Sequence, residues 1–242
     1  MNEREIIRSK QNPLVRQLRA LMRAASGPGD LIVLEGVRLI EEALSAGVTL
    51  VSLAASDRLG ESERGRRLLA LAARAGAAAR WLDGPVLASL SELDTSQGVL
   101  AVARRPRAPL TRRHASAAPL ILVACELQNP GNLGGLIRTA EAAGVTEVRV
   151  TAGSTDPFSW KSLRGSMGSV FRVPCTQGGD PRQILAELDA QGVRSLASVA
   201  EGGTPYDRVD FRRPVAVWVG NEGAGLPGAL LELIGGRVTI TM

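Results

Sequence analysis

Short apolar runs and longer amphipathic stretches alternate along the first half of the chain. Apolar runs that predict strands lie at residues 31–34, 48–56 and 98–105, and amphipathic stretches that predict helices ending at glycines lie at 37–47 and 61–76. A further helix is predicted to begin at Asn12-Pro13, because asparagine caps a helix start and proline fits the first turn. Its apolar stripe is Leu14, Leu18, Leu21 and Met22, and its basic face is Arg16, Arg19 and Arg23. The pattern predicts a small α/β domain over residues 1–103.

Residues 120–242 follow a stricter rhythm of short apolar runs and helical segments. The apolar runs lie at 120–125, 145–153, 169–174, 194–200, 214–220 and 237–242, and the helical segments at 132–144, 181–192 and 227–236. Most runs are apolar throughout rather than alternating, which is typical of strands buried on both faces. We therefore expect a second α/β domain whose sheet is mostly parallel and whose ligands bind outside the carboxyl ends of the strands.

Residues 104–119 separate the two patterns with prolines and five arginines, and are predicted to be an interdomain linker. A solvated linker and one that touches RNA both remain open. The net charge of +5 modestly favours a polyanionic partner. Nearly all the basic residues are arginine, so a coding bias is an alternative explanation of the charge.

Composition also excludes several classes of protein. The chain has no apolar run long enough to span a bilayer and no secretory h-region near its start, so we expect a cytoplasmic protein. Cys125 and Cys175 are far apart in the sequence and are expected to be buried thiols, and no metal site is predicted. The single histidine, His114, leaves little room for a serine or cysteine nucleophile with a histidine base.

Two loop sequences carry the candidate chemistry, each directly after a predicted strand. Residues 126–140 run from a strand through a loop into a helix, and Asn132 and Arg138 suit a phosphate or a ribose edge. From these residues alone, Asn132 is equally a helix cap and Arg138 equally a surface cation. Residues 217–227 contain three glycines but neither a dinucleotide-binding nor a P-loop signature, so another nucleotide-dependent enzyme is a weaker alternative.

Together these passages resemble the SpoU or TrmH type of RNA ribose methyltransferases, members of the SPOUT class. The resemblance is carried by NPGNLGGLIRTAEAAGV at 129–145, LRGSMGSVFRVP at 163–174 and VGNEGAGL at 219–226. SKQNPLVRQL and LIVLEGVRLIEEAL, in the first domain, resemble the family's substrate-binding domain. The resemblance implies S-adenosylmethionine-dependent methyl transfer to a ribose 2′-hydroxyl of structured RNA, ribosomal rather than transfer RNA. It also implies a homodimer, a C-terminal trefoil knot and no metal.

The resemblance also implies roles for particular residues. Arg138 would orient the hydroxyl or its neighbouring phosphate with support from Asn132. Glu222 would either line the cofactor or act as a structural carboxylate that bonds loop N–H groups. The implied cofactor-binding residues are Ala200, Gly220, Asn221, Glu222, Ile240 and Met242, and the implied RNA contacts are Arg16, Arg19, Arg23, Lys161 and Arg164. Because only 3% of residues are aromatic, recognition by RNA shape and backbone is favoured over stacking.

The resemblance departs from the family at the last strand. Family members continue into a Ser-Leu-Asn-Val loop and a final helix, whereas this sequence stops at Met242, and Thr241 stands where proline is common. We therefore expect a truncated chain whose active site is incomplete. A non-catalytic RNA-binding relative is the alternative from a different functional class.

Overall fold

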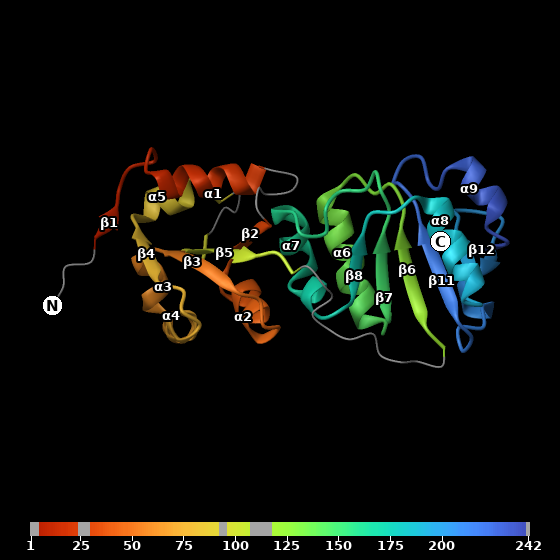
Figure 1. The fold of residues 1–242 in the computed structure, drawn as a ribbon, viewed down its shortest axis with the longest axis horizontal. Helices are drawn as coiled ribbons and strands as arrows, with labels where there is room; N and C mark the ends of the chain where they lie inside the picture. The colour runs from red at the N-terminus through yellow and green to blue at the C-terminus, as the bar shows by residue number, and fades with distance from the viewer. Residues whose placement is uncertain (1–4, 24–29, 92–95, 107–117, 241–242) are drawn as a thin grey trace.

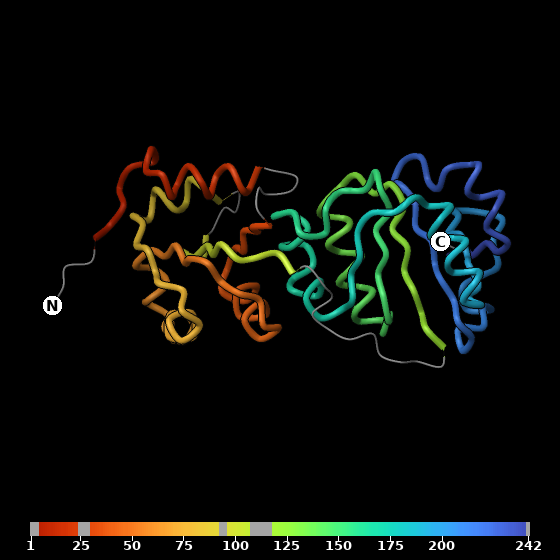
Figure 2. Tube along the Cα trace, in the orientation of Figure 1, coloured from red at the N-terminus to blue at the C-terminus, as the bar shows by residue number. Residues whose placement is uncertain are grey.

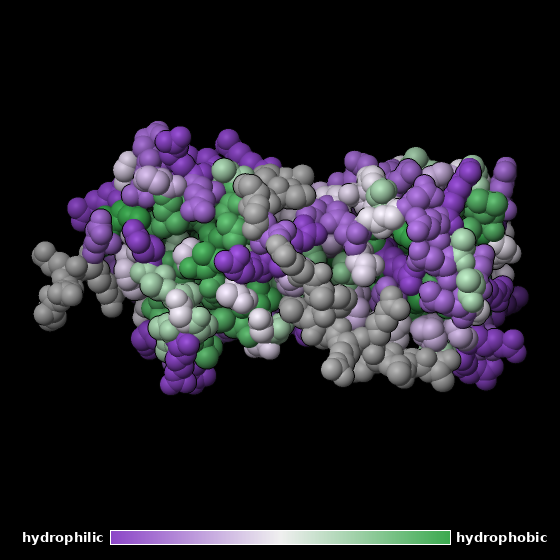
Figure 3. All heavy atoms as spheres, viewed as in Figure 1, coloured by the Kyte–Doolittle hydropathy of each residue, from purple (hydrophilic) through white to green (hydrophobic). Residues whose placement is uncertain are grey.

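The computed structural model describes residues 5–23, 30–91, 96–106 and 118–240 and contains a five-stranded and a seven-stranded sheet (Figure 1). His114, Thr241 and Met242 lie outside the described residues. The sheets lie side by side along the longest axis of the molecule (Figure 1). On the face shown in Figure 3, hydrophobic residues gather over the first sheet, whereas hydrophilic residues cover much of the second half.

The five-stranded sheet has the order β1-β4-β3-β5-β2 and is mixed, because β5 pairs antiparallel with both β3 and β2. Its strands are β1 (Ile6–Ile7), β2 (Leu31–Glu35), β3 (Leu50–Ala55), β4 (Ala79–Leu82) and β5 (Val99–Arg104). Its helices are α1 (Pro13–Arg23), α2 (Val37–Ser45), α3 (Asp57–Glu61), α4 (Glu63–Arg74) and α5 (Gly84–Ala88). Alternate strand residues face opposite sides, so Leu34 packs with α2 and α4 while Val33 packs with α1 and α5.

The seven-stranded sheet has the order β10-β12-β9-β11-β6-β7-β8, and every pairing described is parallel. Its strands are β6 (Leu120–Ala124), β7 (Glu147–Val150), β8 (Cys175–Gln177), β9 (Arg194–Ser198), β10 (Thr204–Pro205), β11 (Val215–Val219) and β12 (Gly236–Thr239). Its helices are α6 (Pro130–Ala142), α7 (Trp160–Ser166), α8 (Pro181–Ala190) and α9 (Gly228–Leu233). This confirms the predicted α/β fold with a mostly parallel sheet.

Strand β6 shows why the second sheet requires continuous apolar runs. Leu122 and Ala124 pack against α6 on one face, whereas Ile121 and Val123 pack with α8 and α9 on the other. Because helices cover both faces, neither set of alternating side chains reaches water.

The prediction of a strand over residues 169–174 is wrong. The chain there forms a short 3-10 helix, Ser169–Phe171, and the strand follows at β8. Met167 and Gly168 both have positive φ, 51° and 90°, and this sharp turn after α7 leaves the apolar residues in a helical turn rather than an extended run. Phe171 is nevertheless fully buried. The apolar residues of this segment are therefore explained by their place in the core and not by a strand.

Polar side chains connect the two domains. Arg172 bonds both Glu141 of α6 and Glu42 of α2, and Arg105, just after β5, pairs with Asp156 and donates to Gln177 Oε1 at 2.8 Å. The backbones of the two domains also meet, because α7 lies beside β2 although about 125 residues separate them in the sequence (Figure 2). None of the described helices is long and apolar enough to cross a membrane.

Candidate active site

The two candidate loops meet at one edge of the seven-stranded sheet. Strands β6 and β11 are parallel neighbours, paired from Leu120–Val215 to Ala124–Val219, so their carboxyl ends are adjacent. The loop after β6 leads into α6, and the loop after β11 leads toward α9. Both loops therefore face the edge at which parallel sheets usually bind ligands.

Asn129, and not Asn132, caps helix α6. The Asn129 side chain accepts hydrogen bonds from the backbone N–H groups of Gly131 and Asn132, at 2.8 and 3.3 Å. The suggestion that Asn132 is the cap is therefore wrong, because the preceding asparagine already fills that position. The Asn132 side chain is exposed in the first turn of the helix and is available for another role.

Asn132 instead contacts the second loop. Its Nδ2 donates to Glu222 Oε1 at 2.8 Å, across 90 positions of sequence. An amide that donates through its nitrogen has its carbonyl oxygen directed away from that bond, where it can accept a proton donor. Glu222 thus fixes which way the Asn132 amide faces.

Asn221 shapes the second loop. Its Oδ1 accepts from the N–H groups of Gly223 and Ala224, and its Nδ2 donates to the Glu126 carbonyl at 3.2 Å. The bonding of loop N–H groups that Glu222 was expected to provide is therefore provided by Asn221. Together, the bonds from Asn221 and Asn132 tie the two loops at two separate points.

Only glycine fits at position 220. A Cβ atom built there would lie 2.2 Å from the Gly225 carbonyl carbon and 2.4 Å from the Leu226 nitrogen, far inside van der Waals contact. Asn221 and Gly225 exchange backbone hydrogen bonds of 3.0 and 2.8 Å, which closes the loop into a tight turn. The absence of a side chain at Gly220 therefore lets the loop fold tightly against its own backbone at residues 225–226.

The next two strand ends complete this edge. Thr239 Oγ1 donates to the Ala200 carbonyl at 2.8 Å, which joins the ends of β12 and β9 beside β11. Ile240 is 66% exposed at this edge of the sheet. Met242, expected with them, lies outside the described residues.

Arg138 is exposed on α6 and forms no hydrogen bond or ion pair with the described residues. Six residues separate it from Asn132, which places the two side chains roughly 120° apart around the helix and about 9 Å apart along it. The structure therefore puts Arg138 on the same helix as Asn132 but not in contact with it.

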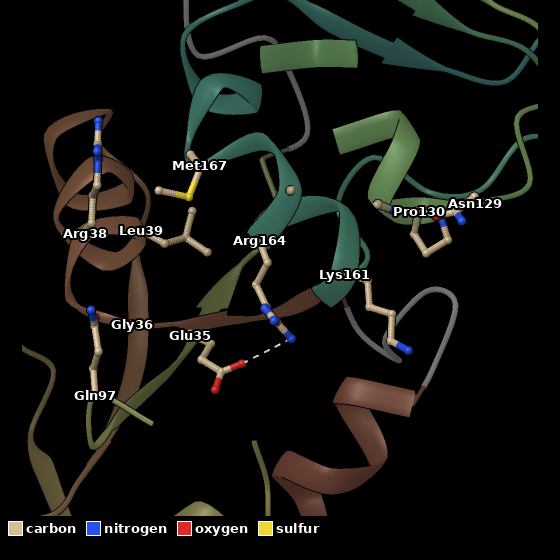
Figure 4. Close-up of a pocket in the computed structure, with 12 residues that line it drawn as sticks. Glu35, Gly36, Arg38, Leu39, Gln97, Asn129, Pro130, Lys161, Arg164 and Met167 are labelled. Atoms are coloured by element: carbon tan, nitrogen blue, oxygen red, sulfur yellow. Dashed lines mark hydrogen bonds and ion pairs between the residues drawn. The ribbon is translucent and has the colours of Figure 1, made fainter. Parts of the chain in front are cut away.

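The expected RNA contacts fall into two separate groups. Arg16, Arg19 and Arg23 lie on the outer side of α1, whose Val15, Leu18 and Leu21 are buried. Lys161 and Arg164 lie on α7 and line a cavity between the domains. Glu35 and Arg38 of the first domain also line it, and the Arg38 side chain extends away from Lys161 and Arg164 (Figure 4). Sequence reasoning missed Glu35, the last residue of β2, and Arg38, near the start of α2.

The cysteines are unsuited to nucleophilic or metal chemistry. Burial raises the pKa of the Cys125 thiol, and burial raises that of Cys175 to about 12, which disfavours the thiolate. Within the described ranges, no three histidine, cysteine or carboxylate side chains cluster as a metal site would require.

Two known protein families match this chain, and one of them covers the residues of the candidate site. Residues 119–242 match the SpoU rRNA Methylase family, and residues 4–116 match the N-terminal region of the thiostrepton-resistance methylases. The chain belongs to the SpoU rRNA methylase family. Both loops that meet at the sheet edge, and the strands that carry them, fall within the SpoU match.

Individual relatives of this SpoU methylase support the assignment. The chain is 33% identical to a 23S rRNA (guanosine(2553)-2′-O)-methyltransferase of Bacillus subtilis, and the match covers 84% of this chain and 76% of the relative. It is 35% identical to an uncharacterized tRNA/rRNA methyltransferase of Synechocystis, over 97% of this chain and 84% of the relative.

Solved structures show the same fold over almost the whole chain. A structure titled RNA 2′-O ribose methyltransferase matches with a TM-score of 0.83 and 32% identity, covering 98% of this chain and 90% of the other. An AdoMet-bound rRNA methyltransferase from Sinorhizobium meliloti matches with a TM-score of 0.82 and 28% identity, covering 98% and 89%. The SpoU methylase is therefore an S-adenosylmethionine-dependent RNA 2′-O-ribose methyltransferase.

The strand ends of this SpoU methylase fit such a cofactor. Gly220 is partly exposed, while Ala200 and Ile240 offer small and large apolar surfaces along the same edge. An adenine ring needs an apolar face and backbone partners for its nitrogens, and this edge supplies both.

Proposed function

We propose that this chain transfers a methyl group from S-adenosylmethionine to a ribose 2′-hydroxyl in ribosomal RNA. The observation that carries the proposal is the pair of contacts between loops, Asn132 with Glu222 and Asn221 with Glu126. These bonds bring a polar, helix-borne loop and a glycine-lined loop to one place at the carboxyl edge of the sheet. Residues 1–103 would recognise the RNA, 104–119 would link the domains, and 120–242 would carry out the transfer.

When bound, S-adenosylmethionine supplies an activated methyl group on a sulfonium, so the protein has mainly to position the acceptor and assist its proton. The Asn132 Oδ1, with its amide fixed by Glu222, accepts the hydrogen bond of the 2′-hydroxyl and sets its direction. Arg138 stabilises the alkoxide charge that develops on the same oxygen. Its guanidinium stays protonated and therefore does not act as the base. The hydroxyl proton would pass to solvent water as the methyl group is transferred.

The cofactor site is proposed at the ends of β9, β11 and β12. Gly220 and Asn221 would contribute backbone groups, Glu222 a carboxylate, and Ala200 and Ile240 apolar surface. Met242 belongs to the same proposed set by its position after β12. No metal is needed, because the methyl donor is already charged.

The protein is further proposed to act as a homodimer. Leu230 of α9 and Ile234 just after it enter the core, whereas Leu233 is 53% exposed and available to a partner.

The test uses 23S and 16S ribosomal RNA and transfer RNA transcribed in vitro, which carry no modifications, with S-adenosylmethionine labelled in the methyl group. We expect label in ribosomal RNA at a single nucleotide that becomes resistant to alkaline hydrolysis, because 2′-O-methylation removes the attacking hydroxyl. Label on a base, or label only in transfer RNA, would contradict the proposal.

Arg138→Ala tests the catalytic assignment. We expect kcat to fall by about 100- to 1,000-fold because alkoxide stabilisation is lost. Affinity for S-adenosylmethionine, measured by calorimetry, should stay within twofold of the parent. Arg138→Lys is the matched control and should recover part of the rate through its charge. Equal turnover by Arg138→Ala and the parent would remove this residue from the mechanism.

A further inference from the structure

Residues 151–160 run from the end of β7 to the first residue of α7, and they contact both the first domain and the loop that precedes α6. Residues 125–129, between β6 and α6, are named the catalytic loop, because they lead to Asn132. Residues 151–160 are named the bridging segment. The contacts of this segment determine how the catalytic loop is connected to the first domain.

Arg105 reaches the bridging segment from the first domain. It is the residue directly after β5, and its backbone N–H donates to the Asp30 carbonyl at 2.6 Å, beside the start of β2. Its guanidinium pairs with both carboxylate oxygens of Asp156 and donates to Gln177 Oε1 at 2.8 Å. The guanidinium also lies 4.8 Å from the centre of the Phe158 ring. The backbone of Arg105 thus belongs to the first domain, whereas its guanidinium is bound by the second.

The Asp156 carboxylate depends on Arg105. Its side chain is 4% exposed, and its Oδ1 accepts a further hydrogen bond from the Phe158 N–H at 2.8 Å. A carboxylate buried to this extent is costly unless it is paired with a cation and hydrogen-bonded. Loss of Arg105 would therefore force the bridging segment to rearrange around Asp156 or to admit water.

Trp160 attaches the other end of the bridging segment to the first domain. Its side chain is buried in the same core cluster as Val33, Leu100 and Val102 of the five-stranded sheet. The first domain therefore holds the bridging segment at two points, through the ion pair at Asp156 and through apolar packing at Trp160.

Leu127 of the catalytic loop is bonded to the bridging segment through both of its backbone groups. Its carbonyl accepts from the Thr155 N–H at 2.7 Å, and its N–H donates to Ser154 Oγ at 3.2 Å. Thr155 is the residue next to Asp156. The carboxylate that Arg105 holds is therefore one residue away from a hydrogen bond to the catalytic loop.

Glu126 has a backbone conformation that needs support from its neighbours. Its φ is 55°, in a region that residues other than glycine seldom adopt. Its N–H donates to Thr151 Oγ1 at 3.2 Å, and its carbonyl accepts from Asn221 Nδ2 at 3.2 Å. The bridging segment thus holds one side of this residue, and the glycine-lined loop after β11 holds the other.

We propose that Arg105 is a positioning residue for methyl transfer, which holds the catalytic loop in place through the bridging segment. The contacts run from Asp156 through the catalytic loop to Asn221 of the second loop. The geometry of the reacting groups then depends on the docking of the first domain, although Arg105 takes no part in the chemical step. This inference rests on the proposed function, because it takes methyl transfer as the reaction that the catalytic loop serves.

The test compares the steady-state methyl transfer of Arg105→Ala and Arg172→Ala, below the unfolding temperature of both. Arg172 also joins the domains, but within the described part of the chain it bonds neither the bridging segment nor the catalytic loop. We expect kcat of Arg105→Ala to fall by about 10- to 100-fold, since a small misplacement of a reacting group has effects up to about this size. Arg172→Ala should keep kcat within about threefold of the parent, because the catalytic loop retains its contacts. If Arg105 only docked the domains, its loss would raise KM for RNA and leave kcat unchanged.

Two further variants test the route through Asp156. Lysine keeps the charge but cannot pair with both Asp156 oxygens and Gln177 at once, so kcat of Arg105→Lys should lie between those of Arg105→Ala and the parent. Asparagine at position 156 still accepts from the Phe158 N–H and removes the unpaired charge. The double variant Arg105→Ala/Asp156→Asn should therefore exceed kcat of Arg105→Ala by about threefold or more. A double variant no faster than Arg105→Ala would show that the effect does not pass through Asp156.

Hydrogen–deuterium exchange of the backbone amides gives a measurement that does not depend on activity. In Arg105→Ala, exchange within residues 125–129 and 151–159 should be about tenfold faster than in the parent, and in Arg172→Ala it should be unchanged there. The proposal is wrong if Arg105→Ala keeps the kcat of the parent, or if exchange in these two segments does not change. A parent that transfers no methyl group to RNA, with exchange changed as expected, would refute the proposed function alone. An active parent with unchanged exchange in Arg105→Ala would refute the positioning role alone.

Discussion

The amide nitrogen and the amide oxygen of the Asn132 side chain have separate roles. The nitrogen is engaged by Glu222 at 2.8 Å, so rotation of the amide would exchange a favourable contact for one between two oxygens. The orientation of the amide is therefore set by a residue of the other loop. At this scale, the arrangement of the reacting atoms depends on a single hydrogen bond.

Asn132→Ala tests this dependence. We expect kcat for methyl transfer to fall by about 100-fold, the usual effect of removing one positioned hydrogen-bonding group. The affinity for S-adenosylmethionine should change little, since Asn221 still ties the loops together. The measurement is methyl incorporation under saturating cofactor.

Glu222→Gln is the companion variant. The glutamine oxygen can still accept from Asn132, so we expect kcat above that of Asn132→Ala and within tenfold of the parent, because one neutral hydrogen bond is worth about 1 kcal/mol. A rate as low as that of Asn132→Ala would mean that the Glu222 charge itself takes part.

At this scale the sequence predicted the meeting of the two loops but not all of its details. Strand-end positions identified both passages. Asn132 was considered as the cap of α6, whereas the backbone conformation makes Asn129 the cap. Glu35 and Arg38 could not be recognised as cavity residues, because the part of the lining on α7 lies about 125 positions away. No local pattern records such a distant partner.

At the scale of elements, the close contact of α6 with α7 connects the candidate active site at the start of α6 to the cavity between the domains. A Cβ atom on Gly134 would lie 2.5 Å from the Ser162 carbonyl oxygen and 2.8 Å from the Ser166 nitrogen. Both neighbours are backbone, so they cannot turn aside as a flexible side chain would. The two helices therefore fix each other's position.

Gly134→Ala should lower the free energy of unfolding by about 1–3 kcal/mol, the usual cost of adding a methyl group to a filled space. Gly135→Ala is the matched control on the same helix, because its added Cβ meets nothing within 4 Å. It should raise stability by about 0.5–1 kcal/mol, since alanine loses less entropy than glycine in a helix. Urea denaturation measures both. A Gly134→Ala protein as stable as Gly135→Ala would show that the helices adjust freely.

Elements with a strong period or a clear boundary were predictable. The start of α1 is confirmed, because Asn12 Oδ1 accepts from the Leu14 N–H at 3.0 Å. Leu18 and Leu21 of the predicted apolar stripe are buried, Leu14 and Met22 are half-buried, and Val15, which was not in the predicted stripe, is buried as well. Strands β1 and β10 have two residues each and exist only through their partners β4 and β12. Helix α7 was not predicted, since its seven residues are too few to show a period.

At the scale of the whole molecule, Arg172 bonds carboxylates of both domains. Its guanidinium lowers the pKa of Glu141 by hydrogen bonding to the carboxylate. A carboxyl group with a lowered pKa stabilises the folded state above its unfolded pKa, and this contribution disappears as pH falls through the folded value. The pair of Arg172 with Glu141, both in the second domain, therefore stabilises the protein less in acid.

Arg172→Ala tests the pH dependence of this stabilisation. At pH 7 we expect the variant to be less stable than the parent, and below about pH 4.3, the ordinary pKa of glutamate, the difference should shrink as Glu141 is protonated. Chemical denaturation between pH 7 and pH 3 gives both curves. Arg212→Ala removes a fully exposed pair with Asp210 and should leave stability unchanged throughout. A difference for Arg172→Ala that stayed constant with pH would contradict this account.

The contact between Gly134 and α7 has a consequence for how the catalytic loop is held. Asn132 lies two residues before Gly134 on α6, and the backbone of Ser162 and Ser166 lies directly against Gly134. A shift of α6 at this point would therefore have to move α7 as well. A substitution in α7 that disturbs this packing should then slow methyl transfer, although α7 itself carries none of the proposed catalytic residues.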